Sequence, residues 1–297
     1  MRMEEIRLSF QGIRVAVRIY TPDTDRIAHR AILVSSPVSD LHSWHRLAVM
    51  MAEAGCLFVT ADLPGFGKCP CVQSAPQDND TRAQILWGIL DEVEKLRGEE
   101  QTKWHLIGHG NGAAAVLSMA LYQPDSTLSR VLISPVVDRF LFAPIHALIA
   151  SNAGESLTLK WHQRYVRSKK RFRKLAEKIY GARIRKDRLI ALHKMMNRKA
   201  VAPLLTRVIR ESFTLNESVY DVKTPVMLIW GSNDRIFGGQ IPPRLKKKLS
   251  HAEMHLVPSA HMSMETHPDM LRDYLRGWLR FSEGREKALI RKDGYKR

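Results

Sequence analysis

Cysteine is scarce in this chain of 297 residues, which has only three of them. Cys56, Cys69 and Cys71 cannot all pair with one another, so they do not indicate a disulfide framework. The close pair Cys69 and Cys71 lacks both the spacing and the further ligands of a zinc site. We therefore expect reduced thiols, no structural metal and a cytoplasmic protein, where thiols stay reduced.

Long apolar runs are also missing. A membrane-spanning helix takes about 18 or more apolar residues, whereas the longest apolar stretch, Phe140–Ala150, is interrupted by Pro144 and His146. This stretch is better interpreted as a buried or pocket-lining segment. The first residues, Met1–Ser9, are charged and mixed, which is not the pattern of a secretory signal peptide.

Acidic residues are few relative to basic ones, and the formal net charge is +17. The segment Lys160–Ala200 alone holds 16 lysines and arginines and two acids, Glu177 and Asp187, a net of +14. A basic block of this kind predicts an anionic partner. The alternative is a solvated helix face that keeps the protein soluble. No nucleic-acid-binding motif accompanies the charge, so we do not expect specific nucleic-acid binding.

The rest of the chain alternates between strand and helix patterns. Because most of these strands are continuously apolar, they predict a mostly parallel sheet with helices on both faces. The fold class is therefore α/β, with an eight-stranded sheet. The expected strands are 5–10, 14–20, 31–35, 57–61, 104–108, 130–133, 225–230 and 254–257, and the expected flanking helices are 44–54, 80–97 and 112–121.

Between residues 138 and 222 the pattern changes to basic, amphipathic helices without a convincing strand. The apolar side chains of one part of this region recur on one helical face; they are Trp161, Tyr165, Phe172, Leu175 and Ile179. We predict a helical cap over 139–221, inserted into a core domain made of 1–138 and 222–297.

The segment Leu106–Ala113, Leu-Ile-Gly-His-Gly-Asn-Gly-Ala, lies between a predicted strand and a predicted helix. It resembles the nucleophile elbow of α/β-hydrolases, in which small residues flank a nucleophile on a sharp turn. In that resemblance Gly110 stands where the family carries its catalytic serine, and Asn111 follows it. Glycine has no side chain with which to attack a substrate.

Two further loops match the family in the expected chain order. Trp230–Asp234 resembles the loop with the catalytic acid, which places that role on Asp234. The loop Ser259–His261 resembles the histidine loop, which places the catalytic base on His261. The resemblance is to cap-bearing esterases, lipases and epoxide hydrolases, and it implies a cofactor-free and metal-free site.

The oxyanion hole is a second departure from the family pattern. In the family, one backbone N–H comes from the loop after an early strand, and another comes from the residue after the nucleophile. The matching loop here contains Ser36 and Pro37, and proline has no N–H. Asn111 is the remaining candidate donor, and Ser36 and Pro37 are expected to line the pocket or the oxyanion loop.

Three functions fit these observations. In the first, His261 and Asp234 form a general base that acts on a small molecule under the cap, in lyase, isomerase or water-activating chemistry. In the second, the chain is a non-catalytic binding or interaction protein on a hydrolase scaffold. In the third, it is a weak or mutationally inactivated serine hydrolase.

The basic cap adds a prediction about partners. Arg164, Arg167, Arg171 and Arg173 are the candidate anion-binding residues, because guanidinium groups suit phosphate and carboxylate. The partner would be an anionic small substrate, an acidic carrier protein or an anionic lipid surface. The pattern does not indicate an oligomeric state.

Overall fold

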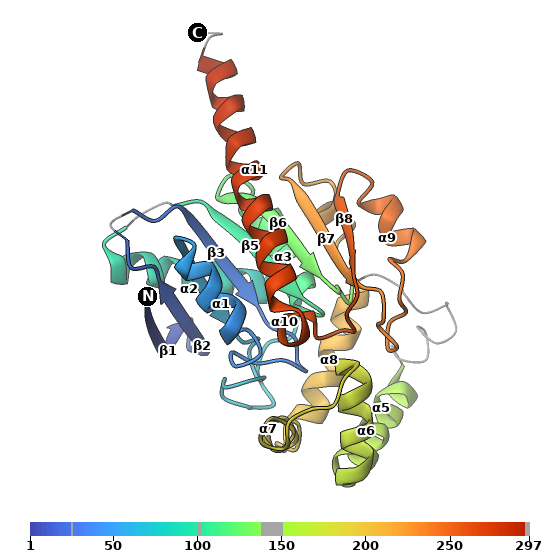
Figure 1. Cartoon of the computed structure of the whole chain (residues 1–297). Helices are drawn as coiled ribbons and strands as arrows, with labels where there is room; N and C mark the ends of the chain where they lie inside the picture. Colours follow the sequence, from blue (N-terminus) through green and yellow to red (C-terminus); the bar gives the residue numbers. More distant parts are fainter. Residues whose placement is uncertain (25, 100–101, 138–150, 295–297) are drawn as a thin grey trace.

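The computed structural model describes residues 1–24, 26–99, 102–137 and 151–294. This part of the chain forms one sheet with helices on both of its faces (Figure 1). Its elements, in chain order, are β1 (Arg2–Phe10), β2 (Ile13–Thr21), β3 (His29–Val34), α1 (His45–Glu53), β4 (Cys56–Ala61), α2 (Asn79–Arg97), β5 (Trp104–His109), α3 (Gly112–Tyr122), β6 (Thr127–Ile133), α5 (Asn152–Val166), α6 (Lys169–Tyr180), α7 (Lys186–Met196), α8 (Val201–Phe213), η1 (Glu217–Tyr220), β7 (Val226–Gly231), α9 (Pro243–Lys248), β8 (Glu253–Val257), α10 (Ser263–Thr266) and α11 (Pro268–Gly294).

The sheet of the described residues has eight strands in the order β1-β2-β4-β3-β5-β6-β7-β8. β1 and β2 form an antiparallel hairpin, and β2 also pairs antiparallel with β4. All the other neighbours are parallel. Every residue of β4, β5 and β7 is buried, as expected for parallel strands covered on both faces. The predicted α/β fold with a mostly parallel eight-stranded sheet is confirmed.

The apolar core lies in two layers, one on each face of the sheet. The helices α2 and α3 cover one face, and Ile89 and Val116 from these helices are fully buried there. On the other face lie α1 and α11, which bury Leu47 and Leu275. The parallel strands are therefore held so that their carboxyl ends meet at one edge of the sheet, where the loops before α1 and α3 and after β7 and β8 converge.

The segment between β6 and β7 is helical where the structure describes it, and residues 151–221 are called the helical insertion below (Figure 1). Leu204 and Val208 of α8 are fully buried in the same apolar cluster as α2 and α3. Phe172 of α6 and Leu192 of α7 belong to the cluster on the opposite face. The predicted cap boundary at residues 138–139 and the apolar stretch Phe140–Ala150 lie outside the described residues.

The helix α6 begins and ends at residues suited to those positions. The side chain of Ser168 accepts a hydrogen bond from the N–H of Arg171, which caps the amino end. Gly181 follows the last turn with φ +67°, a left-handed conformation that glycine adopts without steric cost. These two residues set the length of the most basic helix of the insertion.

The C-terminal helix α11 is the longest of the described helices and projects from the body on the side opposite the insertion (Figure 1). Its sequence is rich in charged residues throughout. No helix of the described residues is both long enough and apolar enough to cross a bilayer.

Candidate functional site

The strand β5 ends in a sharp turn at Gly110, where φ is +54°. The N–H of Gly110 donates to the carbonyl of Ile133 (3.1 Å), and its own carbonyl accepts from the N–H of Val136 (2.9 Å). A Cβ on Gly108 would lie 2.6 Å from the Cα of Ala113. Only a residue without a side chain fits at Gly108, because the strand and the following helix approach so closely.

Asp234 and His261 meet at the same edge of the sheet, from the loops after β7 and β8. His261 Nδ1 lies 2.9 Å from Asp234 Oδ2. The other carboxylate oxygen, Oδ1, accepts the N–H groups of Ile236 (2.8 Å) and Phe237 (2.9 Å). Burial by itself raises the pKa of Asp234, but the hydrogen bond and charge of His261, with these two N–H groups, hold it below its ordinary value.

An ionised Asp234 determines which nitrogen of His261 can act as a base. The carboxylate accepts the Nδ1 proton of the imidazole, so neutral His261 keeps the lone pair on Nε2. This nitrogen faces the turn at Gly110: an ideal Cβ on Gly110 would lie 3.5 Å from it. The same Cβ would lie 2.9 Å from Ser36 Cβ and 3.5 Å from Ser36 Oγ. The sequence prediction that Asp234 and His261 belong together therefore agrees with the geometry, and Ser36 lies beside them.

Two aromatic rings pack against His261. His109 lies with its ring centroid 4.7 Å away, and its Nε2 is 3.1 Å from the carbonyl oxygen of His261. Burial, together with the neighbouring His261, lowers the pKa of His109 well below its ordinary value, so this ring is neutral and donates from Nε2. Phe237 packs on another side at 4.8 Å. His109 thus holds the backbone of His261, a contact that the position of His109 next to the elbow did not reveal.

A cavity of about 330 Å³ lies above this edge of the sheet. Ser36, Pro37, Asn111 and His261 line it on the side of the sheet. Its volume suits a small organic ligand. The insertion supplies most of the remaining wall with apolar and aromatic side chains, among them Trp161, Tyr165, Phe172, Leu175, Ile179 and Met196.

The insertion also places a second buried histidine in the wall of this cavity. His162 on α5 is 6% exposed, and its Nε2 has no hydrogen-bond partner among the described residues. Burial lowers the pKa of His162, so the ring is neutral. The wall of the cavity therefore contains an unpaired imidazole nitrogen among side chains that are mostly apolar. Nothing in the sequence distinguished this histidine from the eleven others.

In the loop after β3, the backbone N–H of Ser36 is bonded within the loop itself. The N–H of Ser36 donates to Ser39 Oγ (2.9 Å), and the two serine hydroxyls lie 3.2 Å apart. Pro37 has no N–H. Asn111 is the residue that precedes α3 and lines the cavity from the elbow side. The residues predicted for the oxyanion region therefore lie around the cavity, but neither Ser36 nor Pro37 presents a backbone donor to it.

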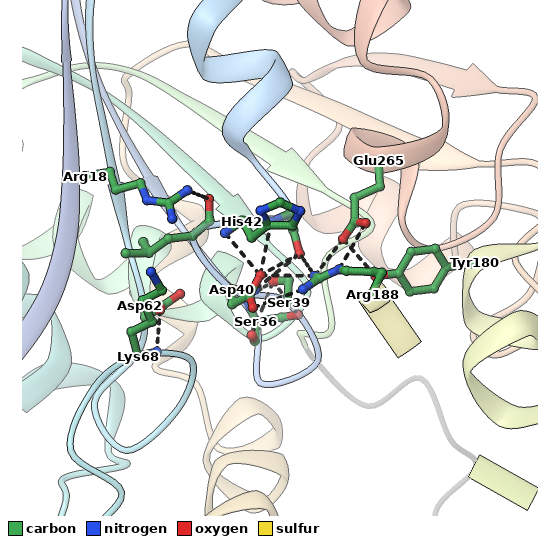
Figure 2. A network of polar contacts seen from close by, with 12 residues as sticks. Arg18, Ser36, Ser39, Asp40, His42, Asp62, Lys68, Tyr180, Arg188 and Glu265 are labelled. Carbon is green, nitrogen blue, oxygen red and sulfur yellow. Dashed lines mark hydrogen bonds and ion pairs between the residues drawn. The ribbon is translucent and has the colours of Figure 1, made fainter. Parts of the chain in front are cut away.

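Arg188 of α7 connects the insertion to the loops of the sheet, as Figure 2 shows. Its guanidinium donates to Asp40 (3.0 and 3.1 Å), to Glu265 (2.8 and 3.3 Å) and to Ser43 Oγ (2.6 Å). Tyr180 donates to Glu265 as well (2.7 Å). Burial by itself raises the pKa of Asp40, but Arg188 lowers it below its ordinary value.

This network corrects the simple interpretation of the basic segment. Arg188 belongs to the block of 16 lysines and arginines, but its side chain is 7% exposed and lies between two carboxylates. Its charge is therefore neutralised locally and is not presented to a partner. Helical periodicity and a count of charges could not reveal this buried ion pairing of Arg188, because Asp40 and Glu265 are far from it in the chain.

The four predicted anion-binding arginines lie on the outside of the insertion. Arg164 is on α5, Arg167 follows that helix directly, and Arg171 and Arg173 are on α6. All four are exposed, and none has an ion pair within the described ranges. None of them lines the cavity. The structure thus places them on an outer surface rather than around a bound small molecule.

A further polar cluster lies at the opposite edge of the sheet. Glu283 Oε1 lies 2.7 Å from His29 Nδ1 and 3.3 Å from His105 Nε2, and the three potential ligand atoms are within 4.8 Å of one another. Ser129 Oγ accepts the indole N–H of Trp278 (3.0 Å) and lies 2.8 Å from His105 Nδ1. An ionised carboxylate can only accept hydrogen bonds, so His105 carries a proton on Nε2, toward Glu283. We interpret the cluster as a hydrogen-bond network in which Glu283 accepts from both imidazoles.

Residues 32–265 match the protein-family model described as serine aminopeptidase, S33. The chain belongs to this family of α/β-hydrolases. The match begins in β3 and ends in α10, so it spans the elbow, the insertion and the loops with Asp234 and His261. The family assignment agrees with the resemblance found from the motifs alone.

Other α/β-hydrolases resemble the chain over most of its length. A 2-hydroxy-6-oxononadienedioate/2-hydroxy-6-oxononatrienedioate hydrolase of Burkholderia vietnamiensis is 22% identical over 252 residues, covering 81% of this chain and 83% of the relative. Among solved structures, a membrane phospholipase A superimposes with a TM-score of 0.73 at 18% identity, covering 95% of this chain and 87% of that one. The CarC serine hydrolase of carbazole degradation has a TM-score of 0.71 at 13% identity, covering 94% and 100%. The structural similarities show the shared fold.

Proposed function

We propose that this α/β-hydrolase acts on a small apolar molecule in the cavity, with His261 as a general base and without a serine nucleophile. The observation that carries the proposal is the position of His261 Nε2, 3.5 Å from the site of a Cβ on Gly110. In the serine members of the superfamily the nucleophile is activated from this direction. Here the base faces a residue with no side chain, and in this proposal it takes its proton from a molecule in the cavity.

The surroundings of Asp234 and His261, called the dyad below, favour a functional base over a vestigial pair. Asp234 accepts three hydrogen bonds, one of them from His261, and it stays ionised. An ionised carboxylate orients the imidazole and stabilises the imidazolium that forms when Nε2 takes a proton. His109 and Phe237 pack against the ring and keep it in place. A positioned base of this kind accelerates proton transfer by about 10²–10⁴.

Two reactions are balanced when His261 is the only catalytic group that the protein supplies. His261 can remove a carbon-bound proton, which moves to Nε2 while the electron pair stays on the substrate and expels or rearranges a bond. Alternatively, Nε2 takes a proton from a water molecule as the water oxygen attacks a carbonyl carbon, and the proton then passes to the leaving group. The apolar wall of the cavity selects for an apolar substrate in both reactions.

The oxyanion region favours the first of these reactions. Attack at a carbonyl builds negative charge on an oxygen, which hydrolases stabilise with two N–H donors. Ser36 gives its N–H to Ser39, and Pro37 has none. Loss of one such donor costs a factor of about 10²–10³. Proton removal from carbon with loss of a good leaving group avoids that requirement.

The test uses 5-nitrobenzisoxazole, a small apolar ring that opens when a base removes its carbon-bound proton. We expect the wild-type protein to open it with saturation, and we expect His261→Ala and Asp234→Asn to lower the turnover number by about 10²–10⁴. The exposed His251 offers a matched control, and His251→Ala should leave the rate unchanged.

Thermal melts of the three variants would show that each one is folded. A turnover number that does not change in His261→Ala would sink the general-base proposal. The chain would then be better described as a binding protein on a hydrolase scaffold, with the cavity as its ligand site.

A further inference from the structure

The outer face of α5 combines apolar and cationic side chains that nothing in the described protein covers. Leu157 and Trp161 are 51% and 45% exposed. Lys160 and Arg164 are also exposed, at positions three and seven residues after Leu157. Because these intervals return to the same side of an α-helix, the four side chains share one face, called the docking face below. We propose that the docking face binds the surface of an anionic lipid bilayer.

The composition of the docking face fits a bilayer interface better than water. A helix that lies in a membrane surface carries apolar anchors on one side with lysine and arginine beside them. Tryptophan is the side chain preferred at that depth, because its ring is apolar and its N–H remains near water. Leu157 and Trp161 supply the anchors, while Lys160 and Arg164 can extend their charged ends toward lipid phosphates.

The neighbouring helix strengthens the attraction. The exposed Lys169, Lys170 and Arg171 begin α6, directly after the turn that follows α5. Among the exposed cations of Lys160–Ala200, ion pairing within the described ranges is limited to Arg185, which pairs with Asp187. The remaining charges are therefore presented outward, and an anionic surface attracts each nearby cation.

The docking face also adjoins the cavity. Trp161 is half-exposed and at the same time lines the cavity, and its ring packs against Tyr165 at 4.8 Å, another residue of the cavity wall. A molecule that leaves the bilayer beside Trp161 would reach the apolar wall of the cavity directly, without crossing open water. This surface goes beyond the proposed catalysis, since it names where an apolar substrate enters and does not depend on the dyad.

The fluorescence of Trp161 reports on binding in the test. Of its six tryptophans, Trp161 is 45% exposed and the other five are at most 5% exposed. Insertion of Trp161 into a bilayer therefore dominates any blue shift of the emission. The experiment titrates the protein with vesicles of equimolar phosphatidylcholine and phosphatidylglycerol, and with vesicles of phosphatidylcholine alone. A second vesicle set carries bromine in the acyl chains, which quenches a tryptophan that reaches them.

We expect a blue shift and quenching with the mixed vesicles, little response with phosphatidylcholine alone, and weaker binding at high salt, which screens exposed charges. The double variant Lys160→Gln/Arg164→Gln should bind about thirty-fold more weakly. The variant Leu157→Ser should lose much of the quenching. The matched controls are Lys246→Gln/Lys247→Gln on α9 and Leu256→Ser on β8, where the side chains are also exposed; both should bind as the wild type does.

Three results would overturn the proposal: no binding to the mixed vesicles, binding without a response of Trp161, or equal weakening by the α9 control. Binding to an acidic carrier protein but not to vesicles would likewise reject the bilayer as the partner. The variant His261→Ala separates this proposal from the catalytic one. It should bind vesicles normally, so that failure of catalysis and failure of docking are seen independently.

Discussion

At the scale of single residues, Ser36 determines what position 110 can hold. A Cβ at Gly110 would stand 2.9 Å from Ser36 Cβ, closer than side-chain carbons pack, and Ser36 cannot swing that atom away because it is attached directly to the backbone. The backbone at Gly110 also has φ +54°, which costs a residue other than glycine about 1–3 kcal/mol. The turn therefore favours glycine at position 110 through its neighbour as well as through its own backbone.

This crowding predicts the outcome of restoring a hydroxyl. Gly110→Ser alone should remain unlabelled by a fluorophosphonate probe, as the wild type should, because Ser36 displaces the new side chain. The double variant Gly110→Ser/Ser36→Gly removes the opposing Cβ and places the hydroxyl near His261 Nε2, so it should become labelled. The measurement is the labelling rate followed by intact-protein mass.

Its control is the triple variant with His261→Ala, which should label no faster than the single variant. Turnover of simple esters should stay low even in the double variant, since Pro37 leaves the oxyanion short of a donor. Equally fast labelling of Gly110→Ser and of the double variant would show that Ser36 does not obstruct position 110.

At the scale of elements, one side chain ties α7 to the sheet. Arg188 lies between Asp40 and Glu265 with almost no exposure (Figure 2). Removing one partner of a buried ion pair leaves the opposite charge without compensation, which costs about 3–5 kcal/mol. We therefore expect Arg188→Ala to lower the free energy of unfolding by about that amount in urea titrations.

Arg185, one turn before Arg188 on the chain, is the matched control. It pairs with Asp187 at the surface, with both side chains largely exposed, and surface pairs contribute about 0–1 kcal/mol. Arg185→Ala should therefore change little. If Arg188→Ala prevents folding, Arg188→Lys and Asp40→Asn give smaller losses that can still be measured. Equal losses for Arg185→Ala and Arg188→Ala would contradict the proposed tie.

A second set of contacts holds the middle of α11 against β3 and β5. Burial by itself raises the pKa of Glu283, but hydrogen bonds from His105 and His29 lower it to about 2 from an ordinary value of 4.5. A carboxyl whose pKa is lower in the folded state stabilises the fold above its unfolded pKa, and that stabilisation is lost as pH falls. The contribution of Glu283 should be complete above about pH 4.5 and should vanish as pH falls through about 2.

The expected result is a pH-dependent effect of Glu283→Gln. The difference in unfolding free energy between wild type and variant should be largest above pH 4.5 and should shrink toward pH 2, as measured by denaturant titration at several pH values. Glu286→Gln removes a neighbouring carboxylate of α11 that pairs with Lys103 near the surface, and it should have a smaller effect. A difference for Glu283→Gln that is constant with pH would show that the hydrogen bonds to His29 and His105 do not hold the carboxylate ionised.

At the scale of the whole molecule, the exposed basic residues are separated from the Asp234–His261 pair. The exposed basic residues concentrate on the helical insertion, which lies on the side of the molecule opposite the projecting end of α11 (Figure 1). Asp234 and His261 lie where the loops after β7 and β8 meet, and His261 lines the cavity that the insertion helps to form. Electrostatic attraction acts over about 10 Å at moderate salt. The exposed cations can therefore orient the whole molecule toward an anionic surface without entering the cavity, and a largely apolar cavity can remain beside a strongly basic exterior.

The α/β fold and the dyad could be predicted from the sequence because they depend on local patterns. Continuous apolar strands between helices require a parallel sheet, and the carboxyl ends of such strands meet at one edge, so the loops with Gly110, Asp234 and His261 had to converge. The helical character of 151–221 was visible for the same reason, since amphipathic spacing and caps such as Ser168 act over a few residues.

Only the tertiary structure decided how residues far apart in the chain act on one another. Charge counting treated Arg188 as one of sixteen similar cations, whereas packing buries it between Asp40 and Glu265. It also brings Ser36 against position 110 and places His109 behind His261. These contacts join separate loops, and no periodicity or spacing encodes their distances. The sequence by itself therefore determined which groups could do chemistry, and the packing of the loops decided which of them are buried, crowded or free to meet a substrate.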